Sequence, residues 1–176
     1  MLSLLATGCG IVGPASPDKE QGASMNMQEA AERADHILDD TFSAIKPPVE
    51  WTYTYDMPGG CYVDRSRSVM TIISPQRRGS FLGLVERHWK NKGYKLVGVS
   101  EDKLSAFFLT PDNFQLEVTI VTNGQADFGV TTPCVEKSPV APPAKLSSGP
   151  DYSKRTFAPA PNVHSDFWSA ETPVSH

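Results

Sequence analysis

The sequence lacks the motifs that most enzyme classes need. It has only four histidines, no HExxH motif and no pair of histidines four positions apart, so the usual helical zinc-protease signature is excluded. No Walker-type phosphate loop and no dinucleotide fingerprint follows any predicted strand. The segment GSFLG at 79–83 is not a GxSxG nucleophile elbow, because its serine is in the wrong position. We therefore predict a protein that is not an enzyme and needs no cofactor and no metal.

The sequence also has no pair of carboxylates at a spacing that would indicate an acid–base dyad. The nearest approach is two adjacent pairs, Asp39–Asp40 and Glu101–Asp102. Neighbouring side chains in a helix or turn point apart, so these pairs indicate solvated surface rather than an acid–base dyad. His88, on a predicted helix, is the best single candidate for a titrating group, although a histidine on a helix face is usually structural.

Long hydrophobic runs are missing as well. No stretch approaches the about 20 apolar residues that a membrane-spanning helix needs. The net charge is only −4, but it is unevenly distributed. Residues 1–60 carry three basic and nine acidic side chains, residues 61–95 carry eight and two, and residues 96–176 carry five and nine. The basic segment could face anionic lipid or a wall polymer; we favour a solvated helix face, or pairing with the acidic first helix.

Cysteine is scarce, and the first of the three cysteines determines the predicted compartment. Cys9 follows the apolar and small residues LLATG at 4–8. This stretch resembles the lipobox of bacterial lipoproteins, in which a cysteine thiol takes a diacylglyceryl group and a peptidase cleaves before it. The resemblance implies lipidation at Cys9, a signal-peptide remnant at 1–8 and a place on the extracytoplasmic face of the cell membrane. The stretch departs from a full signal, because no basic residue precedes Lys19 and the apolar run is short; the alternative is an ordinary terminus with a chance cysteine.

Lipidation of Cys9 would leave two cysteines to explain. Cys61 and Cys134 are then an even number in an oxidising compartment, which implies a disulfide. Closing so long a loop would stabilise the fold by roughly 4 kcal/mol through the entropy of the unfolded chain. The alternatives are a reactive thiol or a metal site. Metal binding has little support, because the chain has no CxxC and no histidine lies near either cysteine in sequence.

Two segments have compositions that predict no packed structure. Residues 9–26 are rich in Gly, Pro, Ser and Ala without apolar periodicity, so we expect a flexible tether. Proline, serine and alanine dominate residues 137–176, and we expect a disordered tail there. Residues 27–136 have the length of one domain. The aromatic residues of the tail form a short docking motif or lie back on the domain: Phe157, Phe167 and Trp168.

The hydrophobic pattern predicts two helices and six strands. Apolar residues at helical spacing indicate helices over 27–45 and 75–92. Strands are predicted at 51–55, 66–74, 94–99, 103–110, 114–122 and 125–132. This order, helix, two strands, helix, four strands, predicts an α+β domain with a single antiparallel sheet of about six strands and both helices on one face.

Local signals refine this prediction. Asn26 and Glu29 have the spacing of a capping box at the start of the first helix. Asn123–Gly124 is typical of a type I′ hairpin between the last two strands. Gly79 and Gly83, four positions apart in the second helix, indicate close packing of that helix against the sheet.

A second resemblance covers the segment 85–135. It is carried by VERHW at 85–89, KGY at 92–94, TPD at 110–112 and TPCV at 132–135. These segments look like small uncharacterised lipoproteins of high-GC Gram-positive bacteria. They are structural, so the resemblance supports the fold and the compartment, and it implies no catalytic residue.

Two groups of residues are candidates for binding. Aromatic residues that alternate along the first strand form the candidate contact surface, unless they are core beneath the helices: Trp51, Tyr53 and Tyr55. Arginines that flank the second strand form a candidate anion site near the N-terminus of the second helix: Arg65, Arg67, Arg77 and Arg78.

These observations together predict a lipid-anchored extracytoplasmic protein. Its domain is expected to be a non-catalytic binding or interaction module at the cell surface. The expected partners are the membrane, through the anchor, and a protein or envelope polymer; export excludes nucleic acid. One alternative is a cell-envelope enzyme that acts on wall polymer, and another is a cytosolic protein with a chance lipobox.

Overall fold

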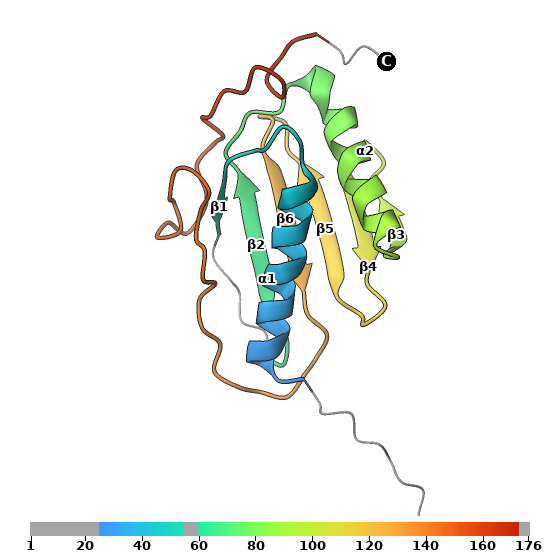
Figure 1. Cartoon of the computed structure of the whole chain (residues 1–176), viewed down its shortest axis with the longest axis vertical. Helices are drawn as coiled ribbons and strands as arrows, with labels where there is room; N and C mark the ends of the chain where they lie inside the picture. The colour runs from blue at the N-terminus through green and yellow to red at the C-terminus, as the bar shows by residue number, and fades with distance from the viewer. Residues whose placement is uncertain (1–24, 55–59, 173–176) are drawn as a thin grey trace, which may run out of the picture.

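Two helices and six strands follow one another in the predicted order. The structure is a computed structural model that describes residues 25–54 and 60–172 (Figure 1). The elements are α1 (Met27–Ala44), β1 (Trp51–Tyr53), β2 (Asp64–Val69), α2 (Pro75–Asn91), β3 (Lys95–Val99), β4 (Ser105–Leu109), β5 (Gln115–Ile120) and β6 (Ala126–Thr131).

All six strands form one antiparallel sheet. The strand order is β1-β2-β6-β5-β4-β3, and every neighbouring pair is antiparallel. Both helices cover the same face of this sheet, with α1 over β2 and β6 and α2 toward β4 and β3 (Figure 1). The predicted α+β class and the placement of both helices on one face are confirmed.

The core lies between the helices and this face of the sheet. Alternation along β5 turns Leu116 and Val118 toward the helices, and Phe128 on β6 joins them. Trp89 of α2 is 1% exposed, packs edge-on against Phe128, and donates its indole N–H to a hydroxyl of α1, Oγ1 of Thr41 (2.9 Å). A buried indole N–H needs such a partner, so this bond ties the two helices together.

The predicted capping box is present at the start of α1. The Asn26 side chain accepts from the backbone N–H of Glu29 (3.1 Å), and the Glu29 carboxylate accepts from the backbone N–H of Asn26 (2.9 Å). Two backbone donors that the helix leaves unpaired are thereby satisfied.

Three local predictions need correction. β2 begins at Asp64 and ends at Val69, because the N–H groups that follow bond to segments outside the sheet, as Ile72 does to the carbonyl of Val163 (2.8 Å). The β5–β6 loop is not type I′, because Gly124 has a positive φ (84°) and Asn123 does not. Gly79 does not mark close packing, since a Cβ there would meet no atom within 4 Å.

The tail is a larger correction, because its described part, 137–172, lies against the domain instead of being disordered. Residues 146–148 run beside β1: the Tyr53 N–H donates to the Leu146 carbonyl (2.7 Å), and the Ser148 N–H donates to the Trp51 carbonyl (3.0 Å). The tail therefore covers the outer edge of β1, as the path along that side of the sheet in Figure 1 shows.

Trp168 anchors the end of this tail in the core. Its side chain is 1% exposed and packs edge-on against Phe81 of α2, with ring centroids 5.2 Å apart. Its indole N–H donates to the Pro47 carbonyl (2.7 Å). Of the two alternatives for the tail aromatics, this one lies back on the domain.

Candidate functional site

The face of the sheet away from the helices is polar. The register places Ser68 opposite Asp127, and Glu117 opposite Gly129, so these positions share the helix-free face. Each of three carboxylates on this face accepts a hydrogen bond from a nearby hydroxyl: Thr131 donates to Asp64 (2.6 Å), Thr119 to Glu117 (2.8 Å) and Ser68 to Asp127 (2.5 Å). A carboxylate has room for several donors, so these groups keep capacity for a ligand.

A cavity of about 460 Å³ lies on this face, between the sheet and the tail. The amide of Gln125 donates to the Pro159 carbonyl (2.9 Å) and so holds the tail beside β6. Phe157 contributes an aromatic ring to the cavity and is itself 81% exposed. The lining residues are Thr54, Ser68, Gln125, Asp127, Thr156, Phe157 and Ala158.

Asp127 is the titratable group of this cavity. Burial raises the pKa of its carboxyl above the usual range; the hydrogen bond from Ser68 lowers it in part, and the nearby negative charge of Glu117 raises it further. Burial disfavours the charged form of a carboxyl. Raised carboxyl pKa values in a cavity are typical of functional sites, so Asp127 is the strongest single candidate for contact with a ligand.

A second cavity of about 300 Å³ lies further along the helix-free face. Gly129 lines it, and a Cβ at this glycine would meet no atom within 4 Å. The exposed side chains of Val97 and Phe107 line it from β3 and β4, while Gln115 and Glu117 supply polar groups from β5. The absence of a side chain at Gly129 therefore helps to make this hollow.

The structure does not assemble the four predicted arginines into one anion site. Arg65 and Arg67 are each 2% exposed and face α1. The Nε of Arg65 lies 3.3 Å from the Asp35 carboxylate, and Nη1 of Arg67 lies 2.7 Å from the Asp39 carboxylate. This pairing with the acidic first helix is one of the two interpretations favoured for the basic segment. Because carboxylates already compensate them, these two arginines fix where α1 lies on the sheet instead of attracting an anion.

The other two arginines have different partners. The guanidinium of Arg77 lies over the ring of Phe167, 4.7 Å from its centroid. Arg78 donates to the Thr122 carbonyl (2.8 Å). The Ser74 hydroxyl donates to the carbonyl of Ala170 (2.5 Å) and makes no cap to α2. The tail thus occupies the N-terminal region of α2 that was predicted to receive the anion.

The predicted aromatic contact surface is not formed. Trp51 is 4% exposed and Tyr53 is 9% exposed. Trp51 packs against Phe42 of α1, and the guanidinium of Arg67 lies 4.1 Å from its ring centroid. Both residues belong to the helix-covered face, which was the alternative interpretation. Tyr55 lies outside the described residues.

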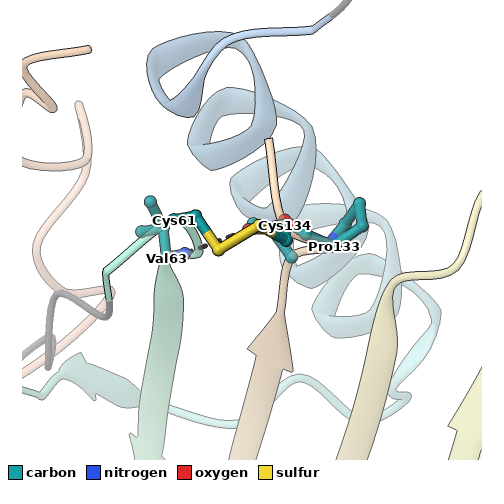
Figure 2. The surroundings of a disulfide bond; sticks show 5 residues. Cys61, Val63, Pro133 and Cys134 are labelled. Carbon is teal, nitrogen blue, oxygen red and sulfur yellow. Dashed lines mark hydrogen bonds between the residues drawn. A yellow bond between two sulfur atoms is a disulfide. The ribbon is translucent and has the colours of Figure 1, made fainter. Parts of the chain in front are cut away.

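Cys61 and Cys134 form a disulfide, as the cysteine count implied. Figure 2 shows that the bond joins the segment before β2 to the segment just after β6. Two hydrogen bonds flank it: the Val63 N–H donates to Oγ1 of Thr132 (3.0 Å), and the Val135 N–H donates to the Cys61 carbonyl (2.8 Å). The bond therefore holds together chain segments at one end of neighbouring strands.

His88 is occupied by a hydrogen bond between the helices. Its Nε2 lies 2.8 Å from a carboxylate oxygen of Asp40, whose other oxygen accepts from Lys92 (2.8 Å). Burial acts to raise the pKa of Asp40, but the bonds from Lys92 and His88 outweigh it and hold that pKa below the usual range. This arrangement supports the structural interpretation of His88.

The structure bears on metal binding and on membrane-spanning helices only in the described ranges, 25–54 and 60–172. No group of three or more His, Cys, Asp or Glu side chains within them could hold a metal ion. No helix among these residues is long and apolar enough to cross a membrane. Cys9 lies outside the described residues.

Sequence reasoning missed the cavity residues because they come from distant segments. Alternation did place Glu117 on the wet face of its strand, and the same period assigns Asp127 to that face. No local signal brings Phe157 and Asp127 to one cavity. Comparisons with family models, with curated proteins and with solved structures found no match.

Proposed function

We propose that the chain is a lipid-anchored extracytoplasmic protein whose domain is a binding or interaction module at the cell surface. Two features support the compartment. The lipobox-like stretch ending at Cys9 supports an acyl anchor, and the Cys61–Cys134 disulfide fits an oxidising environment.

The helix-free face is the proposed binding surface. The observation that carries this assignment is the 460 Å³ cavity, in which a carboxyl with a raised pKa, Asp127, lies beside an exposed aromatic ring, Phe157. An ionised carboxylate only accepts hydrogen bonds, so the ligand must present donors such as hydroxyl or amine groups. An aromatic ring adds apolar contact area. An envelope polymer with hydroxyl groups offers both hydrogen-bond donors for Asp127 and apolar C–H surface for the ring of Phe157.

The anchor is tested by the intact mass of the protein from its native membrane fraction. We expect a mass that begins at Cys9 and includes acyl chains, with Cys61 and Cys134 reacting with an alkylating agent only after reduction. A mass without acyl chains and with free thiols would contradict the proposal and favour the cytosolic alternative.

The binding face is tested with insoluble wall polymer in a co-sedimentation assay. We expect the purified domain to sediment with the polymer, and Phe157→Ala and Asp127→Asn each to weaken binding by about tenfold, the loss of one good contact. Val121→Ala is the matched control, because Val121 is also exposed but lines neither cavity. Equal binding by all three variants would contradict this face as the site.

One observation favours the alternative of a wall-acting enzyme. A carboxyl with a raised pKa, such as that of Asp127, can act as a general acid, and Glu117 is electrostatically coupled to it. Incubation with soluble wall fragments separates the two functions. Release of smaller fragments by the native protein but not by Asp127→Asn would establish the enzyme, whereas binding without turnover would favour the module.

A further inference from the structure

The two edges of the sheet differ in whether another segment of the chain covers them. At one edge the tail covers β1, through the hydrogen bonds of residues 146–148. At the other edge β3 pairs with β4, and no second strand pairs with β3 within residues 25–54 and 60–172. An edge strand presents backbone N–H and C=O groups that can pair with another chain, so β3 is the edge at which this sheet can be extended.

The β3 edge is also apolar. Leu96, Val97 and Val99 are 37%, 57% and 47% exposed, and Phe107 on the neighbouring strand is 36% exposed. These four make up most of the seven large apolar residues that are exposed in the described part of the chain. Apolar residues that cluster in this way indicate an interaction surface.

The charges along this edge are arranged so that the strand complements itself. Lys95 begins β3, and Glu101 and Asp102 follow its end. When two copies of one strand pair antiparallel, the start of each lies beside the end of the other. Pairing centred on Val97 places Lys95 of each copy opposite Val99 of the other, beside the turn that carries Glu101, within reach of long side chains.

We propose that two copies of this chain associate through β3, antiparallel and about a two-fold axis at Val97. The two sheets then join into one. Tail residues 146–148 already cover the β1 edge, so β3 is the one free edge among the residues that the structure describes. The interface therefore closes as a dimer instead of growing into a fibre.

The proposed dimer has a consequence for the binding face. A two-fold axis perpendicular to the sheet keeps the helix-free faces of both copies on the same side. The two 460 Å³ cavities then face one extended ligand together, which raises avidity for a polymer without any new contact. The dimer itself does not depend on the proposed anchor or ligand.

A bulge in β3 could instead keep this edge unpaired and the protein monomeric. The register shifts between Leu96 and Gly98, and bulges and lysines are devices that keep edge strands from pairing. If the bulge and Lys95 serve that purpose, the protein is a monomer at every concentration, and the proposal is overturned.

The first test is sedimentation equilibrium on the full chain carrying Cys9→Ser, so that no acyl group contributes to association. We expect the mass to rise with concentration from the 19.2 kDa of one chain to twice that value and no further. Val97→Glu should abolish the rise, because it places two carboxylates on the axis. Val121→Glu, at an exposed apolar position outside β3, is the matched control and should leave the rise unchanged.

A charge-swap experiment tests the register. Lys95→Glu and Glu101→Lys should each weaken the homodimer by about tenfold, because each converts the opposite-charge contacts to like-charge ones. An equimolar mixture of the two variants should recover association, since every contact between them is again between opposite charges. A mixture no more associated than its components would overturn the antiparallel β3 arrangement, even if the native chain is a dimer.

Discussion

Gly124 and Gly129 lie close together in the chain but in different surroundings. Gly124, in the β5–β6 loop, has φ of 84°, and a Cβ there would lie 2.5 Å from the carbonyl oxygen of Ile73. Gly129, in β6, has open space where its Cβ would be. A side chain is therefore excluded at the first position for two independent reasons, strain and collision.

We predict that Gly124→Ala lowers the free energy of unfolding by about 1–3 kcal/mol or more, since the αL strain alone costs that amount. Gly129→Ala should change stability by less than about 1 kcal/mol, in the stabilising direction. Urea denaturation followed by fluorescence measures both. Equal losses at the two sites would show that the Ile73 contact does not constrain the loop.

At the residue scale, the raised pKa of Asp127 predicts how the stability of the protein depends on pH. Burial raises its pKa in the folded state, so the folded protein binds a proton more readily than the unfolded chain does. Stability therefore decreases as the pH rises from the ordinary carboxyl pKa through the raised one, and the cost persists at neutral pH. We predict that Asp127→Asn increases the free energy of unfolding at neutral pH, because an amide at this position carries no charge to desolvate.

The same variant should gain nothing at a pH below the ordinary carboxyl pKa, where Asp127 is protonated in both states. Thermal melts of the two proteins across acid and neutral pH measure this convergence. A stability difference that does not vary with pH would mean that the variant acts through its hydrogen bond with Ser68 instead of through charge.

Among the elements, the tail contributes one large side chain to the core, Trp168. Trp168 packs against Phe81, and its indole N–H bonds to Pro47. We predict that Trp168→Ala costs about 3–5 kcal/mol, the usual loss for a buried tryptophan. Phe157→Ala, in the same tail but 81% exposed, is the control and should change stability little. Comparable melting temperatures for both variants and the native protein would mean that the tail does not dock in solution.

The helices are held to the sheet partly by charge. Arg65 and Arg67 on β2 face Asp35 and Asp39 on α1, one helical turn apart. These ion pairs add little net stability, because the two guanidinium groups must leave water and the Asp39 carboxylate stays exposed to it. Their contribution is better described as orientation, since only one placement of α1 satisfies both arginines.

For the molecule as a whole, the disulfide is the main covalent constraint. It closes a loop of 73 positions, which corresponds to roughly 4 kcal/mol from the entropy of the unfolded chain. We predict that reduction lowers the melting temperature by on the order of 10 °C. The double variant Cys61→Ser with Cys134→Ser should melt at the reduced temperature and be insensitive to reductant. An unchanged melt of the native protein on reduction would contradict the stabilising role.

The sequence by itself determined the order of the elements and which face of β5 is buried. Apolar period, capping residues and proline act over a few neighbouring residues, so Asn26 with Glu29 and the alternation through Leu116 and Val118 could be predicted without a structure. The pairing of Cys61 with Cys134 also followed, because the implied lipidation of Cys9 left only these two cysteines.

Only the tertiary structure decided where the tail, the aromatic residues and the arginines lie. Composition predicted a disordered tail, yet Trp168 docks between α2 and Pro47. Alternation along β1 could not tell which of its faces the helices cover, and the structure places Trp51 in the core. The cavity that joins Asp127 to Phe157 likewise arises between segments distant in sequence. Such contacts depend on packing between elements, and the physical forces that set them have no local pattern in the chain.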